Sequence, residues 1–436
     1  MSTIVTKFGG TSLCDAAHFE NVADILRLDP DRRFVVPSAP GKRFEGDEKV
    51  TDLLYACHAL ALEGKDFAGP LDKVGARFEE IARALGLSDR WARALSAIRE
   101  RIPNERTADY AASRGEYLCG VMLSEYLGWD FLDPTEVIFF DAEGRLDSEC
   151  THTLCKVRLT KHSRAVIPGF YGAMPDGAVR TFSRGGSDIT GAIVARAAGA
   201  FLYENWTDVP GFLMADPRIV DKPRLITSLT YRELRELSYM GASVLHEEAV
   251  FPVRKAGIPV NIRSTVHPDH PGTRIVPWTD EVDSTITGIA GHKGFHILTV
   301  EKAMMNAEIG FGRRVLQALE ELGITFEHMP SGIDTLCVVL DERQLEGKQQ
   351  ALVSRIYELT EPDSVDIKTN IALIATVGRG MVGNRGTSAR LFAALTKAGV
   401  NIRMIDQGSS ELNIIVGVDE EDFETAVRAI YEAFVG

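Results

Sequence analysis

The sequence has few of the features that would place it in a membrane, outside the cell or on a metal. Its six cysteines are scattered over 436 residues and form no C-x-x-C pair, which argues against a zinc ribbon or a disulfide framework. No apolar run approaches the roughly 20 residues that a membrane-spanning helix needs. Residues 1–10 show no basic segment followed by an apolar one, so no secretory signal is expected. We therefore expect a cytoplasmic protein that makes no contact with membranes.

The sequence also has fewer basic than acidic residues. The 48 Lys and Arg residues face 62 Asp and Glu residues, for a net charge of −14, and this balance argues against a nucleic-acid partner, which would need a basic surface. The G-x-S-x-G elbow of a serine hydrolase and the H-E-x-x-H motif of a zinc protease are both missing. We predict no protein metal site.

The composition is otherwise that of a folded chain, with 45% hydrophobic and 25% charged residues. At about 100–200 residues per domain, the length predicts two to four domains. A helical stretch is expected over about 51–127, and a helix before it has an apolar face formed by Phe19, Val22, Ala23 and Leu26. Short β-branched segments predict strands at 3–8, 34–36, 137–141, 165–167 and 201–204, with a helix at 189–198. Alternating strands and helices predict an α/β layer fold with a largely parallel sheet.

The last third of the chain contains a repeat. Residues 305–336 align without a gap on residues 381–412, 76 positions later, with eight identical pairs, where chance would give about two. Both copies have the pattern strand, glycine, amphipathic helix, glycine, strand, turn, strand, helix. This pattern predicts a duplicated small α+β module of the split βαβ type. A dimerisation device and a pair of ligand-sensing modules are both compatible with it.

Two glycine-rich turns lie between a strand and a helix. Lys7-Phe8-Gly9-Gly10-Thr11-Ser12 follows the first strand, and Arg184-Gly185-Gly186-Ser187-Asp188 precedes the helix at 189–198. Glycines let backbone N–H groups approach an anion, and a helix N-terminus favours negative charge. Plain tight turns and helix caps explain each motif taken alone. Together they suggest two anion sites at the carboxyl ends of the strands.

The first of these turns resembles the corresponding segment of the aspartate kinases, and the resemblance covers essentially the whole chain. The other matching segments occur in the same order as in that family: Ser38-Ala39, Val50-Thr51-Asp52, Arg114-Gly115-Glu116, Pro168-Gly169-Phe170, 183–188, Thr207-Asp208-Val209, Asp216-Pro217-Arg218, Arg263-Ser264-Thr265, Pro271-Gly272-Thr273, 402–405, 407–411 and Asn413-Ile414.

The resemblance implies an α/β/α sandwich of the amino-acid kinase fold, followed by two α+β ACT modules with a ferredoxin-like arrangement. The expected divisions are a catalytic domain at 1–280 and ACT modules at 281–366 and 367–436. The implied activity is the ATP-dependent phosphorylation of the side-chain carboxylate of L-aspartate, with Mg²⁺, to give 4-phospho-L-aspartate. In that family the reaction opens the synthesis of lysine, threonine and methionine and commonly answers to feedback. A homodimer or larger homo-oligomer assembled through the ACT modules is also implied.

The residue types suit this reaction. A carboxylate nucleophile with a pKa near 3.9 is already ionised and needs no general base, so cations and backbone donors should dominate a site that brings two anions together. The resemblance makes Lys7 and Asp188 the catalytic pair, in which Asp188 orients Lys7 or the substrate ammonium. The substrate residues implied are Ser38, Thr51, Glu116, Arg184, Gly185, Gly186 and Ser187. Those on the nucleotide side are Lys7, Gly9, Gly10, Thr207, Asp208, Leu213, Arg218 and Ser243.

Within the substrate set, Arg184 suits the α-carboxylate of aspartate and Glu116 its ammonium. Ser243 departs from the family pattern, since Gly241-Ala242-Ser243 stands where many relatives have Gly-Ala-Lys, and a serine cannot supply the charge of that lysine. The loop between Pro40 and Lys49 is longer and more charged than the resemblance would suggest.

Regulation is open at this point. Met305, Phe311 and Glu327 match positions near the effector in lysine-sensitive relatives, although a solvated strand-edge role suits Glu327 equally well. Lysine, threonine, both or neither remain possible effectors. Two alternative functions also remain: a catalytically weak amino-acid sensor of the same fold, and a kinase of another acceptor such as glutamate or acetylglutamate.

Overall fold

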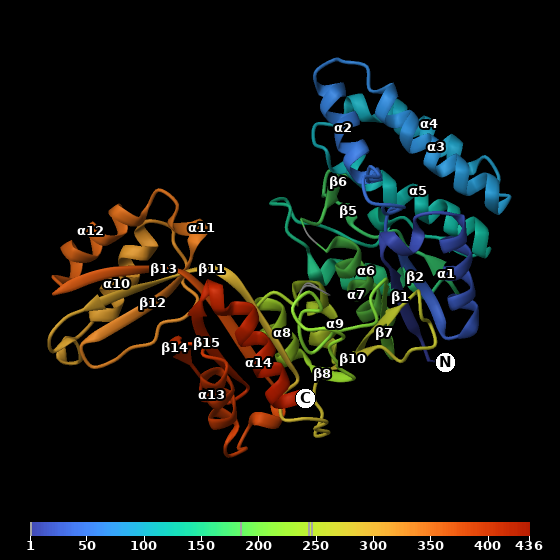
Figure 1. The fold of residues 1–436 in the computed structure, drawn as a ribbon. Helices are drawn as coiled ribbons and strands as arrows, with labels where there is room; N and C mark the ends of the chain where they lie inside the picture. Colours follow the sequence, from blue (N-terminus) through green and yellow to red (C-terminus); the bar gives the residue numbers. More distant parts are fainter. Residues whose placement is uncertain (1, 184, 243–244, 246) are drawn as a thin grey trace. The chain divides into compact units, whose positions relative to one another are not determined.

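The computed structural model describes residues 2–183, 185–242, 245 and 247–436, and the chain forms two compact units (Figure 1). The first unit comprises Met1–Phe212, Thr227–Tyr231 and Val244–Thr279. The second comprises Leu213–Ile226, Arg232–Ser243 and Asp280–Gly436. The chain therefore passes between the two units five times.

An eight-stranded sheet lies at the centre of the first unit, with the strand order β3-β4-β2-β1-β7-β9-β10-β8. Its strands are β1 (Ile4–Phe8), β2 (Arg32–Pro37), β3 (Asp130–Phe131), β4 (Ala165–Val166), β7 (Leu202–Thr207), β8 (Ser228–Thr230), β9 (Val260–Ser264) and β10 (Thr273–Val276). All neighbouring pairs are parallel except β9 and β10. A separate hairpin joins β5 (Tyr171–Ala173) to β6 (Val179–Thr181).

Helices cover both faces of this sheet. Those of the first unit are α1 (Ala16–Leu28), α2 (Val50–Leu62), α3 (Ala68–Leu85), α4 (Arg90–Arg101), α5 (Asp109–Leu127), α6 (Ser148–Leu159), α7 (Gly186–Ala198) and α9 (Phe251–Ala256). Side chains alternate between the two faces of a strand. Phe8 therefore faces the core shared with α1 and α5, and Lys7 faces α7. Helix α7 packs on β1, β2 and β7. The predicted sandwich with a mostly parallel sheet is thereby confirmed.

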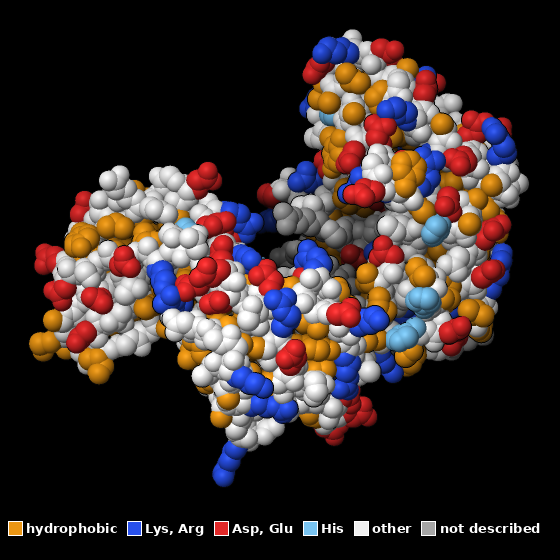
Figure 2. Space-filling model, in the orientation of Figure 1, with side chains coloured by type: hydrophobic (Ala, Val, Ile, Leu, Met, Phe, Trp, Pro, Cys, Tyr) orange, Lys and Arg blue, Asp and Glu red, His pale blue; other side chains and the backbone are white. Residues whose placement is uncertain are grey.

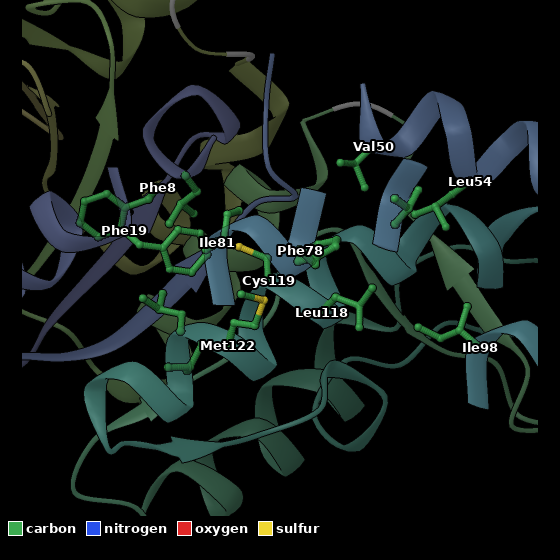
Figure 3. Close-up of a cluster of buried hydrophobic side chains, with 14 of the residues drawn as sticks. Phe8, Phe19, Val50, Leu54, Phe78, Ile81, Ile98, Leu118, Cys119 and Met122 are labelled. Carbon is green, nitrogen blue, oxygen red and sulfur yellow. The ribbon is translucent and has the colours of Figure 1, made fainter. Parts of the chain in front are cut away.

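The main apolar core of the first unit joins the sheet to its helices (Figure 3). The predicted apolar face of α1 is buried, and Phe19 lies near Phe8 and Met122 of α5 in this core (Figure 3). Phe8 also stacks on Trp206 of β7, with ring centroids 5.9 Å apart. Burial of these large side chains anchors the end of β1, and the turn that follows it, to the sheet.

The strand predicted at 137–141 is wrong. The segment follows a short 3-10 turn at Pro134–Glu136 and makes only isolated bridges, from Phe139 to Ala173 and from Phe140 to Leu146. Val137, Ile138 and Phe140 are buried as in a strand. The hairpin β5–β6 and a threonine side chain nevertheless supply hydrogen bonds to this segment in place of a strand partner.

A five-stranded sheet forms the main body of the second unit, with the order β12-β11-β13-β15-β14. Its strands are β11 (Gly288–Glu301), β12 (Thr335–Asp341), β13 (Ser364–Val377), β14 (Ile402–Asp406) and β15 (Asn413–Asp419). The helices of this unit are α8 (Tyr231–Tyr239, of which Tyr231 lies in the first unit), α10 (Phe311–Glu321), α11 (Glu342–Leu345), α12 (Gln349–Thr360), α13 (Thr387–Lys397) and α14 (Phe423–Val435).

The repeat is visible in the elements. Strand β13 begins 76 residues after β11 and has the same length, and α13 begins 76 residues after α10. The two long strands pair antiparallel along their whole length, so that residues 288–292 lie beside 373–377, next to β15, while 295–301 lie between β12 and 364–371. The second module therefore takes the first residues of β11, 288–292, as its fourth strand, while the rest of β11 belongs to the first module.

Helix α8 is attached to the ACT region by its side chains. Three of them form hydrogen bonds there: Glu233 with Arg379 and Thr287, Glu236 with Asn413, and Tyr239 with Glu327. Glu233 is fully buried, and its carboxylate lies 2.9 Å from the Arg379 guanidinium. The segment 213–226 is also tied to this region, because Ile289 donates to the carbonyl of Met214 and Tyr431 accepts from the amide of Arg224.

Candidate active site

The candidate site lies at the carboxyl edge of the first unit's sheet, around β1. Strand order places β2 on one side of β1 and β7 on the other, so β1 is the switch point at which the chain's strands diverge. Open α/β sheets bind their ligands at such a point. The turns after β1, β2 and β7 meet at this edge, since all three strands are parallel.

Three polar side chains converge at the end of β1. Lys7 Nζ lies 2.7 Å from Asp188 Oδ1 and 3.5 Å from Asn205 Oδ1. The Asn205 amide donates to the same Asp188 oxygen at 2.8 Å. Lys7 and Asn205 are opposite each other in the β1–β7 pairing, so both side chains face α7 and its Asp188. These contacts hold the side chain of Lys7 in place at the end of β1.

The glycine turn after β1 is packed against backbone. Gly9 donates to the carbonyl of Trp206 at 3.0 Å, and Gly41 donates to the carbonyl of Gly10 at 2.7 Å. A Cβ at Gly10 would lie 2.7 Å from the carbonyl oxygen of Ala39 and 3.2 Å from the nitrogen of Gly41. Only glycine lets the turns after β1 and β2 approach this closely.

The second glycine turn begins α7. Gly185 is the N-cap, in the left-handed region with a φ of +57°, and a Cβ at Gly186 would lie 2.5 Å from the ring of Phe170. Ser187 packs on Gly169, where a Cβ would come within 2.5 Å of its hydroxyl. The site prediction for Arg184 lies outside the described residues.

Glu116 is a buried carboxyl group on α5. Its residue is 6% exposed, and burial raises its pKa to about 7, opposed by a hydrogen bond from the Ala39 backbone and by the charge of Arg114. In the described part of the chain, its Oε2 atom is buried without a hydrogen-bond partner. Gly115 allows the approach of Ala39, because a Cβ there would lie 2.8 Å from the Ala39 methyl group. A cationic ligand group would satisfy this carboxylate.

The charged loop between Pro40 and Lys49 is held by a buried ion pair. Arg77 donates to Asp47 at 2.5 Å and to the carbonyl of Gly41 at 3.0 Å, and Arg43 binds the same carboxylate. These contacts hold the pKa of Asp47 well below its usual range, chiefly through the hydrogen bonds from Arg43. Ser38 and Thr51, which flank this loop, are both half-buried.

The residues expected on the nucleotide side are divided between the units. Thr207 ends β7 in the first unit and Asp208 follows it, and the threonine hydroxyl donates to the Asp208 carboxylate at 3.1 Å. Leu213 and Arg218 belong to the second unit, and the exposed Arg218 pairs with Asp216. Ser243 lies outside the described residues.

Of the residues expected near an effector, two are buried and the third is half-buried. Met305 and Phe311 are buried in the core of the first ACT module, whereas Glu327 accepts a hydrogen bond from Tyr239 of α8.

One cluster of metal-binding side chains occurs in the described chain. Cys14, Asp15 and His18 place ligand atoms within 4.8 Å of one another. Asp15 caps α1 through the His18 amide at 3.0 Å and accepts from the His18 ring at 2.7 Å, and burial raises the pKa of the Cys14 thiol to about 11. His292 and His296 have the H-x-x-x-H spacing but lie on a strand, where each ring bonds to a backbone carbonyl.

Two residues of the site were missed by sequence reasoning. Asn205 bridges Lys7 and Asp188. A polar residue inside the buried segment 202–206 was the feature of the sequence that could have indicated it. Phe170 has a φ of +84°, a conformation that a bulky side chain adopts only when its surroundings impose it. Its neighbour Gly169 packs on Ser187, so the strain lies beside the start of α7.

Comparisons with known proteins agree with this architecture. The model of the amino acid kinase family matches residues 2–264, and an ACT domain model matches residues 374–434. The chain belongs to the amino acid kinase family. Within it, the chain is an aspartate kinase: aspartokinase 3 of Bacillus subtilis is 39% identical over 449 residues, which span 99% of this chain and 98% of that protein.

Solved structures carry the likeness further. The aspartate kinase of Clostridium acetobutylicum matches with a TM-score of 0.91 and 49% identity over all of both chains. E. coli aspartokinase III in complex with aspartate and ADP matches with a TM-score of 0.74 and 26% identity over 99% of both chains. The same protein in complex with lysine and aspartate matches with a TM-score of 0.72 and 27% identity over all of both chains.

Among the described residues, no helix is both long and apolar enough to span a bilayer. On the face shown in Figure 2, acidic and basic side chains are interspersed.

Proposed function

We propose that this chain transfers the γ-phosphoryl group of ATP to the side-chain carboxylate of L-aspartate, giving 4-phospho-L-aspartate. The observation that carries the proposal is the Lys7–Asp188–Asn205 cluster at the switch point of the sheet, beside two glycine turns. The acceptor is already an anion, so the site must supply positive charge and N–H donors rather than a base.

In this mechanism Lys7 binds the transferring phosphoryl group. The Lys7 side chain is 10% exposed and is fixed by Asp188, so little reorganisation is needed as charge develops on the phosphoryl oxygens. The amide of Gly10 adds a donor at the N-terminus of a 3-10 turn, Gly10–Leu13, while the amide of Gly9 is already bonded to the carbonyl of Trp206. Asp188 orients Lys7 and accepts no proton from the substrate.

The chemistry of the donors fits Mg-ATP. Mg²⁺ prefers phosphate oxygens, water and one or two carboxylates, and the described site offers Asp188 as such a carboxylate. When bound, the ion neutralises phosphate charge. Thr207, Asp208, Leu213, Arg218 and Ser243 complete the proposed nucleotide side. The use of a nucleotide, though not this choice of residues, is supported by the complex of E. coli aspartokinase III with ADP.

The residues around Glu116 and the start of α7 are proposed to bind aspartate. Glu116, buried with an unsatisfied oxygen, would bind the α-ammonium, and Arg184 the α-carboxylate. Ser38, Thr51, Gly185, Gly186 and Ser187 would line the same subsite. Ionisation of Glu116 is opposed by burial, so the substrate's ammonium would lower the pKa of this group on binding.

Regulation by amino acids is proposed for the ACT region, by analogy with the lysine complex of the E. coli enzyme. Lysine or threonine is the proposed effector, with Met305, Phe311 and Glu327 near it, and the product would serve lysine, threonine and methionine synthesis. We propose catalysis in residues 1–280, ACT modules at 281–366 and 367–436, and a homodimer or larger homo-oligomer.

Hydroxamate formation from L-aspartate, Mg-ATP and hydroxylamine tests the proposal directly. Product with aspartate but not with glutamate or acetylglutamate is expected, and inhibition by lysine or threonine would identify the effector. Folded protein that forms no hydroxamate, yet melts at a higher temperature with lysine or threonine, would support the amino-acid sensor instead.

A further inference from the structure

Two buried hydroxyl groups and a backbone carbonyl form a chain of hydrogen bonds between three strand ends at the candidate site. Ser12 Oγ lies 3.1 Å from Thr265 Oγ1, and Thr265 Oγ1 donates to the carbonyl of Thr207 at 3.2 Å. Ser12 is 2% exposed and Thr265 is 5% exposed. The three residues follow or end β1, β9 and β7, respectively, so the hydroxyl chain crosses the carboxyl edge of the sheet.

The direction of each hydrogen bond follows from the number of protons. The hydroxyl of Thr265 has one proton, which goes to Thr207. The hydroxyl of Ser12 must therefore be the donor in its contact with Thr265. Each proton has one acceptor, so the removal of either hydroxyl interrupts the chain of hydrogen bonds.

The surrounding backbone makes Thr265 a fixed point. Its amide donates to the carbonyl of Thr207 at 2.8 Å, and its carbonyl accepts from the side chain of Asn21 in α1 at 2.8 Å. The turn after β1 is held on its other side, where Gly9 donates to Trp206. Ser12 is the contact by which the far end of the turn, Gly10–Leu13, is attached to β7 and β9.

We propose that Ser12 and Thr265 are positioning residues that hold the phosphate-binding turn in register with the end of β7. The inference rests on the proposed function, since it assumes that the turn at Gly10–Leu13 meets phosphate through its backbone amides. Neither hydroxyl touches the reacting atoms. They act through the backbone, whose N–H groups must be placed to within a fraction of an ångström for full effect.

The test compares Ser12→Ala and Thr265→Val with the conservative variant Thr265→Ser, which keeps the hydroxyl. Both hydroxyl deletions are expected to lower kcat about tenfold or more, with the KM for aspartate unchanged, and Thr265→Ser is expected to restore most of the loss. The double variant should be little worse than either single one, because the two side chains share one contact.

Thr6→Val is the matched control. Thr6 is a fully buried residue of β1 whose hydroxyl donates to the carbonyl of Phe34 at 3.3 Å, within the sheet. Its loss should lower the melting temperature as the other deletions do, while kcat stays within twofold of the wild type. An equal fall of kcat in Thr6→Val would overturn the proposal, since lost stability would then explain all three variants. Unchanged kcat in Ser12→Ala would overturn it too.

Titration with ADP and with adenosine separates this inference from the proposed function. Ser12→Ala is expected to weaken ADP binding several-fold while adenosine, which has no phosphate, binds as before. Wild-type protein that binds ADP but phosphorylates none of the acceptors would contradict the proposed function. The ADP affinity of Ser12→Ala would still test whether Ser12 positions the turn. Equal ADP affinities of wild type and Ser12→Ala would contradict the positioning role.

Discussion

The ammonium of Lys7 lies 2.7 Å from Oδ1 of Asp188, although the two residues are 181 positions apart in the chain. The strand carries the lysine and the N-terminal turn of α7 carries the aspartate, so the pair forms only when α7 packs on β1. A cation held in this way is oriented for a phosphoryl group before substrate arrives, which is where electrostatic catalysis gains most.

Lys7→Ala tests the role of this cation. We expect kcat to fall by at least ~10²-fold with little change in the KM for aspartate, because the charge acts mainly in the transition state. Steady-state hydroxamate assays give both constants. Asp188→Asn should cause a smaller fall in kcat, since it keeps the lysine and loses its partner. A Lys7→Ala enzyme with normal kcat would rule out the mechanism proposed above.

The affinity for aspartate should depend on pH through Glu116. With a pKa of about 7 in the free protein, the carboxyl group is neutral below that pH and cannot pair with an ammonium, so kcat/KM for aspartate should fall below pH 7. Glu116→Gln should lower kcat/KM and remove this limb of the profile. A wild-type profile that is flat from pH 6 to 8 would contradict the assignment.

The same group makes a prediction for stability. A carboxyl group whose pKa rises from 4.5 to about 7 on folding stabilises the native state while it is protonated, and this contribution is lost as the pH rises through that interval. Urea denaturation of the wild type and of Glu116→Gln at pH 5 and pH 8 gives the free energy of unfolding of each protein. The gap between the two proteins is expected to change with pH. An equal gap at both pH values would contradict it.

Asp47→Ala is expected to destabilise the protein by about 3 kcal/mol, because it leaves the buried guanidinium of Arg77 without its carboxylate. Urea unfolding measures the loss. Asp24→Ala, which removes an exposed pair with Arg27, is the matched control and should cost less than about 1 kcal/mol. Equal costs for the two variants would mean that the Asp47 pair is not buried in solution.

The buried pair between Glu233 and Arg379 should show strong coupling. Glu233→Ala is expected to cost about 3 kcal/mol or more, since it leaves a buried charge behind. Adding Arg379→Met should recover part of that loss in a double-mutant cycle. Thr287 also bonds to Glu233, so the recovery will be incomplete. Additive effects of the two substitutions would show that the pair does not form.

Much of this structure could be predicted from local patterns. The β-branched segment before Lys7 forms β1, the apolar positions of α1 face the core, and the 76-residue repeat is reproduced by β11 and β13. These features depend on neighbouring residues in the chain, whose periodicity the sequence displays directly.

Features that depend on distant chain could not be predicted in this way. Asn205 lies opposite Lys7 because β1 pairs with β7, a register that no local pattern indicates. Residues 137–141 have strand-like composition but lack a strand partner. The strand 288–292 joins the second module because β11 is long enough to extend past the first. In each case pairing across the fold decided the outcome.

The attachment of α8 to the ACT region affects how the protein can be engineered. Residues 213–226 and 232–243 lie within the first 280 positions, yet their hydrogen-bond partners include Ile289, Arg379, Asn413 and Tyr431. A fragment cut at residue 280 would remove Thr287 and Arg379, the two partners that Glu233 binds in the ACT region. A chimera that borrows the regulatory half of a relative would therefore have to borrow these two inner segments with it, as a graft of three pieces rather than one.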